Sequence, residues 1–159
     1  MTIPKSVKYI GYDAFYRCSS LTSITIPKGV TTLGRGAFCE CSGLKKVTLP
    51  KGLKTIDDEA FYDCSALKNV TFLDSITWID SEAFEGTAWL DAQRKKNPLV
   101  VVNHILIDGR TAKGNVTIPK GVKTISGSVF YNCTRLKSVT IPSSVTKISE
   151  YAFLGCSDK

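Results

Sequence analysis

Apolar residues recur along this chain with a period of 23 residues. Phenylalanine marks the period most clearly, at positions 15, 38, 61, 84, 130 and 153. A fixed period of this size is typical of a solenoid, in which one unit cannot bury its apolar face alone and stacks on its neighbours. The interval from Phe84 to Phe130 spans two periods, so the missing phenylalanine falls at Ile107 and the pattern predicts a stack that keeps its register.

Each unit carries one segment with the spacing of a β-strand. In Leu21–Ile26 the residues Ile24 and Ile26 lie two apart with a threonine between them, so both apolar side chains lie on one face. A proline then ends the strand because it has no N–H to donate, and a glycine marks a turn beyond it. A second short apolar pair follows, as in Val122 and Ile125. We therefore expect one main strand per unit.

An Ala-Phe segment closes most units. An acidic residue precedes the phenylalanine by two positions in three of them, as Asp13, Glu59 and Glu82. Because a negative charge is favourable at the start of a helical turn, this pattern predicts one helical or 3-10 turn. The long return path between successive strands requires parallel pairing, which places equivalent residues of neighbouring units about 4.8 Å apart.

One pattern runs through these units and is complete at 136–156: LxxIxIPxxVxxIgxxAFxxC. It resembles the BspA-like leucine-rich repeats, also called the Treponema pallidum type, over nearly the whole chain. The resemblance implies a right-handed leucine-rich-repeat solenoid, with a parallel β-sheet on the concave face and short strands and 3-10 or helical turns elsewhere. It also implies a cell-surface or secreted protein, often bacterial, used for cell adhesion or partner binding, with host matrix or surface proteins as partners. It implies no catalytic residues.

Residues 1–159 are predicted to form a single solenoid domain of about six or seven repeats. Met1 begins in the tail of a strand and the chain stops just after Cys156, so neither end carries a recognisable polar cap. We expect a fragment of a longer array, whose uncapped end repeats favour self-association with another chain. The sequence contains no visible signal peptide and no apolar stretch long enough for a membrane span.

The repeat pattern fails at about 85–115. Thr87 caps a predicted helix through 88–95, and Pro98 ends it. Two β-rich apolar runs then flank Asn103 and His104, which form either a tight turn or a kink in one continuous strand. This divergent unit is either a lateral projection that shapes a binding surface or a modified repeat that keeps the stack continuous.

Basic residues exceed acidic ones, 21 to 14, which gives a net charge of +7. The lysines follow the repeat, and acidic residues gather near the Ala-Phe segments. These columns are either solubilising edges or an attraction for acidic proteins, glycans, nucleic acid or anionic lipid. No nucleic-acid-binding motif accompanies the charge, so polyanion binding through the basic columns is the weaker alternative. The two columns are Lys5, Lys28, Lys51 and Lys120, and Lys8, Lys54 and Lys123.

Five of the six cysteines share one position, three residues after the phenylalanine. In-register side chains stand parallel at about 4.8 Å, whereas a disulfide needs Cβ atoms about 3.8 Å apart and side chains that approach each other. We therefore predict buried free thiols. Cys39 and Cys41 form a CxC pair, but no second ligand pair is present and His104 is the only histidine, so we predict no metal site.

No arrangement of residues in the chain fits an enzyme. A single histidine excludes most histidine-based acid or base catalysis, and the acids form a repetitive column instead of one facing pair. No glycine-rich phosphate loop follows a strand. The sequence predicts no cofactor, no small-molecule substrate and no catalytic residues.

The candidate binding surface is formed by the outward residues of the strands, which mix lysine, asparagine, serine and threonine. Such a surface suits recognition of an extended protein or glycan. Two aromatic residues interrupt a column of threonine and lysine, and they either anchor a partner or cover neighbouring repeats. We predict a non-enzymatic binding or adhesion module; the alternative is a structural spacer within a longer cell-surface protein. The candidate partner-binding residues are Lys45, Lys46, Lys68, Asn69, Lys137, Tyr9, Trp78 and Trp89.

Overall fold

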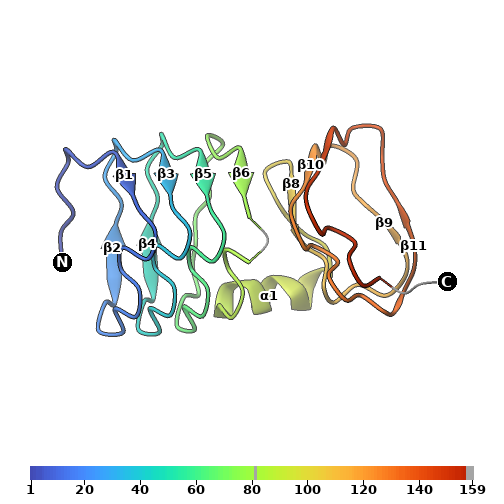
Figure 1. Ribbon diagram of the computed structural model, residues 1–159, viewed down its shortest axis with the longest axis horizontal. Coiled ribbons are helices and arrows are strands. Elements are labelled where there is room, and N and C mark those ends of the chain that lie inside the picture. The colour runs from blue at the N-terminus through green and yellow to red at the C-terminus, as the bar shows by residue number, and fades with distance from the viewer. Residues whose placement is uncertain (81, 157–159) are drawn as a thin grey trace. The chain divides into compact units, whose positions relative to one another are not determined.

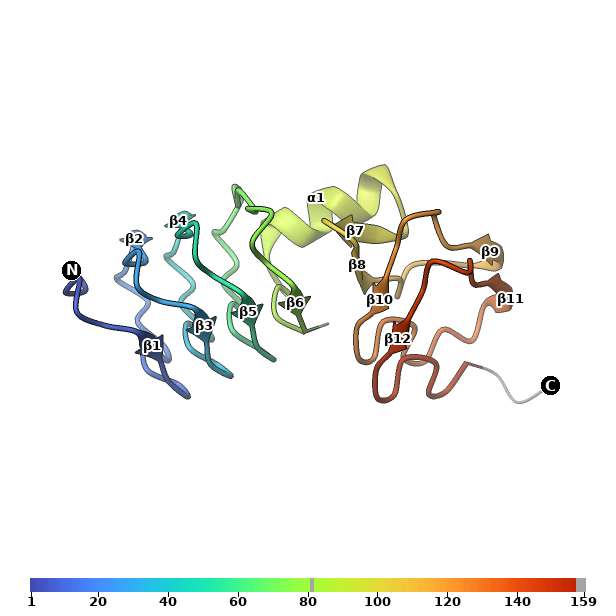
Figure 2. The same ribbon diagram turned by 90° about the horizontal axis from the view of Figure 1, so that it is seen from above.

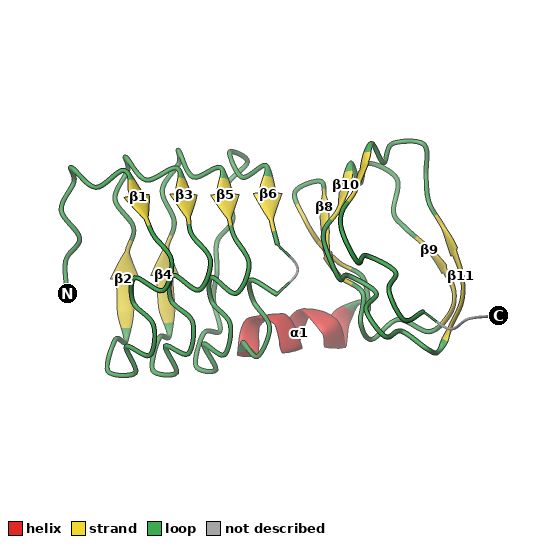
Figure 3. Ribbon diagram, viewed as in Figure 1, coloured by secondary structure: helices red, strands yellow, loops and turns green. Residues whose placement is uncertain are grey.

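The computed structural model of the chain describes residues 1–80 and 82–156. It is a β-solenoid of about six turns with mostly parallel strands, as the 23-residue leucine-rich-repeat pattern predicted (Figures 1 and 3). Contacts divide the chain into two compact units, Met1–Ala92 and Gln93–Lys159, which we call the first and second unit. The single domain expected from the sequence stays a prediction.

In the first unit, the main strand segments form a parallel ladder. Strands β2 (Ser23–Thr25) and β4 (Lys46–Thr48) pair with Ile24 beside Val47, and a single bridge joins Lys46 to Asn69 of the next repeat. Ile24 and Val47 are buried while their polar neighbours are exposed, because successive strand side chains point to opposite faces. The prediction of one parallel strand per repeat is confirmed here for two repeats. In the third repeat the strand is reduced to a single bridge.

The shorter apolar segments of the first unit form a second parallel sheet, apart from β2 and β4 (Figure 2). Its order is β1-β3-β5-β6, and the inward residues Leu33, Ile56 and Ile79 are fully buried. Each outward residue of one strand lies beside the equivalent residue of the next. The four strands are β1 (Tyr9–Ile10), β3 (Thr32–Leu33), β5 (Thr55–Ile56) and β6 (Trp78–Ile79).

The Ala-Phe segments form single i→i+3 hydrogen-bonded turns, as in the Tyr16 N–H bond to the Asp13 carbonyl oxygen at 3.0 Å, so the predicted short turn is present but does not extend into a helix. The acidic residues themselves adopt left-handed backbone, with φ of 50° at Asp13 and 56° at Glu59. A residue with positive φ interrupts a right-handed helix. The backbone also bonds along the stack: the Phe15 N–H donates to the Ala37 carbonyl oxygen of the next repeat at 2.8 Å.

The phenylalanine rings of the first unit stack as one column. Neighbouring ring centroids lie 5.0, 5.4 and 5.3 Å apart, with interplanar angles of 7°, 4° and 16°. Phe38, Phe61 and Phe84 are buried, whereas Phe15 on the first repeat is half-buried. The rings therefore confirm that equivalent residues of adjacent repeats stand in register.

The column cysteines bond to the backbone of the preceding repeat. Cys41 Sγ lies 3.0 Å from the Phe15 carbonyl oxygen, and the same contact recurs at 3.0 Å one repeat later. All six cysteines are free, as predicted. The predicted burial is confirmed for the inner column cysteines. Cys18 and Cys156 are only half-buried, because they lie on the first and last repeats.

Helix α1 (Ala88–Lys96) follows Phe84 and matches the predicted helix with one further residue. Thr87 caps it: the Leu90 N–H donates to Thr87 Oγ1 at 3.1 Å, and the Thr87 hydroxyl donates to the Phe84 carbonyl oxygen at 2.7 Å. Basic residues in the last turn are favourable near the negative end of the helix dipole. Within the described part of the chain, no helix has the length and apolar character needed to cross a membrane.

The second unit opens with a β-hairpin. Strands β7 (Val100–Val102) and β8 (Ile105–Asp108) pair antiparallel across Asn103, which has a φ of 53°. Of the two readings left open by the sequence, the tight turn is therefore correct. Strand β8 begins a parallel series with β10 and β12, and a separate pair is formed by β9 and β11. These strands are β9 (Gly114–Thr117), β10 (Thr124–Ile125), β11 (Leu136–Thr140) and β12 (Lys147–Ile148).

Gly109, not Ile107, occupies the phenylalanine position of the divergent repeat. The Gly109 N–H donates to the Val129 carbonyl oxygen at 3.0 Å, the bond that phenylalanine N–H groups make in other repeats. A Cβ at Gly109 would collide with the Phe130 ring, so only glycine leaves room for it. The register predicted from the sequence is wrong here because the hairpin carries Ile107 within β8.

Candidate binding surface

The exposed side chains over β2 and β4 form a polar surface on the first unit, which we call the first sheet face. The Lys45 N–H donates to the Thr22 carbonyl oxygen at 2.9 Å, and Lys46 lies between Ser23 and Asn69 in the parallel ladder. Four predicted binding residues are thereby brought onto adjacent repeats. The face consists of Thr22, Ser23, Thr25, Lys45, Lys46, Thr48, Lys68, Asn69 and Thr71, all exposed.

The second unit presents a similar polar surface over β9 and β11, the second sheet face. Thr117 pairs with Thr140, and Ser138 Oγ lies 3.0 Å from Asn115 Oδ1. Lys137 is exposed on β11, as predicted. The outward threonines stand in register on both faces, in agreement with the repeated threonine position of the sequence.

The aromatic candidates Tyr9 and Trp78 belong to the other sheet of the first unit. Tyr9 pairs with Thr32 in β3, and Trp78 pairs with Thr55 in β5. Tyr9 is 59% exposed, but its hydroxyl lies over Gly34 of the next repeat, where an added Cβ would approach it to 2.7 Å. Trp78 is half-buried. The structure therefore places these rings apart from the lysines, and the Tyr9 contact supports the covering role.

Trp89 is a core residue. It is 8% exposed, and its ring centroid lies 5.1 Å from each of the Phe72 and Phe84 rings. The backbone N–H of Trp89 donates to the Leu67 carbonyl oxygen at 2.8 Å. Burial of this ring in α1 removes Trp89 from the exposed candidates, because a partner cannot reach it without unpacking the helix.

The first basic residue of the divergent unit, Arg94, forms a buried ion pair. Arg94 Nη2 and Nε donate to the two Asp108 carboxylate oxygens at 2.6 and 2.9 Å, and their side chains are 15% and 2% exposed. Such a two-pronged contact holds a planar guanidinium in one orientation. Arg94 therefore ties α1 to β8 instead of facing a partner. Sequence reasoning missed this role because Asp108 directly follows an apolar run and carries no repeat signal.

A groove adjoins the first sheet face at the ends of β2 and β4. Its floor is apolar, with Ile26 and Leu49, and two lysines of the column after the strand stand at its side. The Pro-Lys-Gly spacing of 23 residues was the sequence signal for this site, and it left open a solubilising edge or an attraction for acidic partners. The lining residues are Thr25, Ile26, Lys28, Thr48, Leu49, Pro50, Lys51 and Gly52.

The acidic residues of the first unit gather around Arg35. Carboxylate oxygens of Asp58, Glu59 and Glu82 lie within 4.8 Å of one another, and Arg35 Nε lies 3.4 Å from both Asp58 and Glu59. Burial, together with repulsion from neighbouring carboxylates, raises the pKa of Asp58 to about 6. The arginine compensates only part of this negative charge, so the cluster stays net negative along the Ala-Phe turns.

Two of the buried thiols, those of Cys39 and Cys133, are poorly suited to nucleophilic chemistry. Burial raises the pKa of Cys39 to about 11 and that of Cys133 to about 11. A cysteine reacts as its thiolate, and a raised pKa keeps these thiols protonated at neutral pH. Cys39 and Cys133 therefore act as packing residues, and the Cys133 thiol also donates to the Gly109 carbonyl oxygen at 3.6 Å.

A family model described as the BspA type leucine rich repeat region matches residues 1–98 and 110–159, in six copies. The unmatched segment contains the whole β7–β8 hairpin, which explains why the pattern fails there. Among curated proteins, none matches the chain.

Several solved structures are similar to the chain. The leucine-rich repeat protein of T. pallidum is 25% identical, with a TM-score of 0.59, and the match covers 98% of this chain and 64% of that protein. A leucine rich cell surface protein of Faecalibacterium prausnitzii is 36% identical, with a TM-score of 0.53, over 97% of this chain and 38% of that protein. A leucine-rich repeat protein of Bacteroides capillosus is 34% identical, with a TM-score of 0.52, over 57% and 71%. The chain thus spans less than two thirds of the first two proteins.

Proposed function

Because the chain belongs to the family of BspA-type leucine-rich repeat proteins, we propose that it is a non-enzymatic adhesion module of a cell surface. Its partner is an extended protein or glycan that lies along the first sheet face. The Faecalibacterium relative, which is named a cell surface protein, supports this location. Repeat proteins of this family are generally non-enzymatic, and the raised pKa values of the Cys39 and Cys133 thiols support the same conclusion for this chain.

The observation that carries the proposal is the exposed run of hydrogen-bonding side chains over neighbouring strands. Lys45, Lys46, Lys68 and Asn69 repeat at the strand spacing of about 4.8 Å, so one extended ligand meets a donor at every repeat. The groove beside Thr25 and Thr48 adds apolar surface at the edge of the same face. Polar groups around apolar surface are typical of specific, reversible interfaces.

Binding to a printed array of purified extracellular matrix proteins and of sulfated and unsulfated glycans tests the proposal. The test variant replaces Lys45, Lys46, Lys68 and Lys137 by serine. The matched control replaces Lys8, Lys54, Lys95 and Lys123 by serine, which removes the same charge from other surfaces of the repeats. We expect the test variant to lose at least about tenfold in affinity for the array hits and the control to keep most of it.

Each alternative outcome has a distinct meaning. Equal losses of affinity in both variants would indicate that diffuse charge attraction, and not a specific face, drives binding. Full retention by the test variant, or no array hit for the native chain, would overturn the proposal and favour the structural spacer.

The uneven distribution of charge favours one second candidate, polyanion binding by the second unit. Residues 93–159 contain eleven lysines and arginines but three acidic residues, whereas residues 1–92 contain ten and eleven. One of those three acids, Asp108, is already paired with Arg94. The net positive charge of the protein therefore comes from the second unit, and it attracts polyanions of any sequence.

Salt dependence distinguishes this second candidate. Binding to heparin and to single-stranded DNA is measured over a range of salt concentrations, since release of counterions makes polyanion affinity fall steeply with salt. A steep slope for both ligands supports charge-driven polyanion binding. No binding at low salt rejects it.

A further inference from the structure

The groove at the ends of β2 and β4 lies inside the stack of the first unit. Two repeats form it, and each has a described neighbour: Ile3 stands one repeat before Ile26, and Phe72 stands one repeat after Leu49. The openness of the groove is therefore a property of these two repeats and not of an end of the chain.

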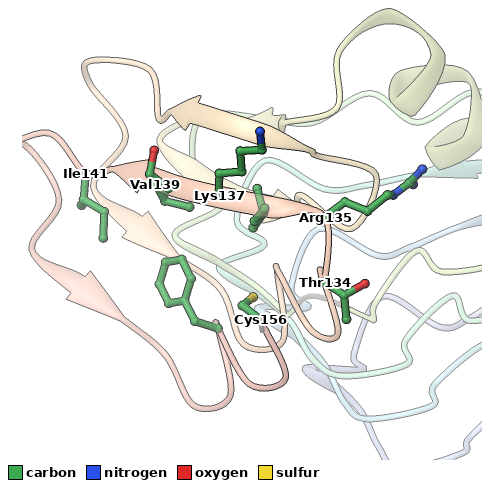
Figure 4. Close-up of a pocket in the computed structure, with 9 residues that line it drawn as sticks. Thr134, Arg135, Lys137, Val139, Ile141 and Cys156 are labelled. Atoms are coloured by element: carbon green, nitrogen blue, oxygen red, sulfur yellow. The ribbon is translucent and has the colours of Figure 1, made fainter. Parts of the chain in front are cut away.

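The hollow beside β11 in the second unit is not a comparable site (Figure 4). Leu136, Val139 and Ile141 line it from the strand segment, together with Phe153 and Cys156 of the last Ala-Phe turn. A further repeat would cover all of these residues in a longer stack. The exposure of that hollow therefore says nothing about a binding role.

The ladder of the main strands stops beside the groove. The Ile26 N–H donates to the Thr48 carbonyl oxygen at 3.0 Å, but the equivalent Leu49 N–H has no acceptor among residues 1–80 and 82–156. Phe72, which takes the position of Leu49 in the next repeat, packs its ring against that of Trp89 at a centroid distance of 5.1 Å. The third repeat therefore packs on α1 instead of continuing the ladder, and the groove stays open at the strand ends.

The floor of the groove is aliphatic. Ile26 and Leu49 line it although they are only 2% and 7% exposed, and Pro50 completes it. Its volume of about 350 Å³ is near the lower end of the range of about 300 to 1,000 Å³ for ligand sites. Sugar hydroxyls placed on this floor would be buried without hydrogen-bond partners, which is unfavourable. The floor therefore favours an aliphatic side chain of a protein over a sugar.

Two exposed lysines, Lys28 and Lys51, stand beside this floor on neighbouring repeats. None of the ion pairs formed among the described residues includes either ammonium group. Asp74 takes the lysine position in the next repeat, so this run of positive charge ends at the groove. Because two neighbouring positive charges attract a negative one, the side of the groove is complementary to a carboxylate.

The spacing of the floor and the lysines fits one extended peptide segment. Ile26 precedes Lys28 by two residues, and Leu49 precedes Lys51 by two, which corresponds to about 6.6 Å of extended chain. Side chains two residues apart in an extended peptide share one face and have the same spacing. An aliphatic residue and an acidic residue separated by one position can therefore contact the floor and the lysines together.

We propose that the groove binds an internal segment of the partner protein in which an aliphatic residue and a glutamate or aspartate are separated by one residue. This inference rests on the proposed function and selects a protein over a glycan as the partner. Thr25 and Thr48 belong both to the groove and to the first sheet face, so a segment along that face continues into the groove. The carboxylate belongs to a side chain, because a segment that crosses the groove has no terminus there.

An NMR titration of the nitrogen-15-labelled 159-residue chain with a synthetic peptide tests the proposal. The peptide is blocked at both ends and contains one leucine and one glutamate, separated by one serine and flanked by glycine and serine. We expect the largest amide shifts at Lys28, Thr48 and Gly52. Replacing the glutamate of the peptide by glutamine should raise the Kd at least about threefold, and replacing its leucine by serine at least about tenfold.

Reversal of the groove charge tests the role of the lysines. Lys28→Glu combined with Lys51→Glu should lose the glutamate peptide and bind instead the same peptide with lysine in place of glutamate. The matched control, Lys120→Glu combined with Lys123→Glu, changes the net charge equally in the second unit, and Lys120 follows a proline as the groove lysines do. The control should bind the glutamate peptide as the native chain does.

Several outcomes would overturn the groove inference. Amide shifts only outside the groove, no shifts at millimolar peptide, or equal losses in the charge-reversed variant and its control would each do so. A second peptide, whose only carboxylate is its free C-terminus, tests the source of the negative charge. Tighter binding of this second peptide would overturn the internal segment.

Failure of this inference is distinguishable from failure of the proposed function. A native chain that binds only glycans on the array would overturn the groove inference and leave the adhesion role intact. The adhesion role is tested separately, by the variant at Lys45, Lys46, Lys68 and Lys137.

Discussion

Two side-chain contacts join each regular repeat to the next regular repeat in the stack. The phenylalanine ring stacks, and the cysteine thiol donates to the backbone one repeat back. Both contacts depend on a neighbour on each side, so the same residue type contributes more in an inner repeat than at an end. Phe61 and Phe15 show this difference: Phe61 is fully buried and Phe15 half-buried.

We predict that Phe61→Ala destabilises the chain by about 3 to 5 kcal/mol, because it empties a site packed between two rings. Phe15→Ala loses contacts on one side only and should cost clearly less. Urea-induced unfolding monitored by circular dichroism gives both free energies of unfolding. Equal losses for the two variants would show that the stacked column is not what stabilises the inner repeats.

Asp58 should make stability depend on pH. Burial raises its pKa from 3.8 to about 6, so the folded state favours the protonated carboxyl. The stability contributed by that preference is complete below about pH 4 and is lost as pH rises through about 6. Asp58→Asn should therefore raise the melting temperature at pH 7 relative to the native chain, and the gain should vanish near pH 4.

Thermal unfolding at both pH values measures this effect, with Asp74→Asn as the exposed control. A gain of the same size at both values would contradict the assignment, because a packing effect does not titrate.

The elements of the divergent unit replace the missing repeat contacts by local ones. Helix α1 is fixed at its start by the buried Thr87 hydroxyl and near its end by the Arg94–Asp108 ion pair. The β7–β8 hairpin presents Gly109 to Phe130, where another repeat would present phenylalanine. The regular stack and this irregular segment are therefore stabilised by different kinds of contact.

Thr87→Ala should reduce stability by about 1 to 2 kcal/mol, since it leaves the Leu90 N–H without its buried acceptor and removes one of the two donors to the Phe84 carbonyl oxygen. Thr87→Ser retains the hydroxyl and should cost much less. Chemical denaturation of both variants measures the difference. Equal effects would mean that the methyl group, not the cap, is what matters.

For the whole molecule, the sequence predicts the solenoid well because every repeat carries the same apolar positions, and parallel in-register stacking follows from them. The register at Gly109 was not predictable, since a count of 23 cannot detect residues that a hairpin inserts. The Ala-Phe segments form short turns as predicted, but the charge preference at a helix start could not predict the backbone hydrogen bonds between repeats.

The candidate site was predicted only in part. Periodicity identified the exposed lysines of the strands, but it assigns residues to columns and not to sheets, so it grouped Tyr9 and Trp78 with them. Trp89 looked available because it departs from the period, although Phe72 and Phe84 bury it. The binding role of the first sheet face stays a prediction.

Lysine acetylation of the chain in complex with its strongest array partner, read by mass spectrometry, tests that role most directly. Acetylation requires an accessible amine, so a lysine covered by the partner reacts more slowly. We predict that Lys45, Lys46 and Lys68 are protected in the complex while Lys8 and Lys54 react as in the free chain. Protection of Lys8 and Lys54 with full reactivity of the first sheet face would contradict the account.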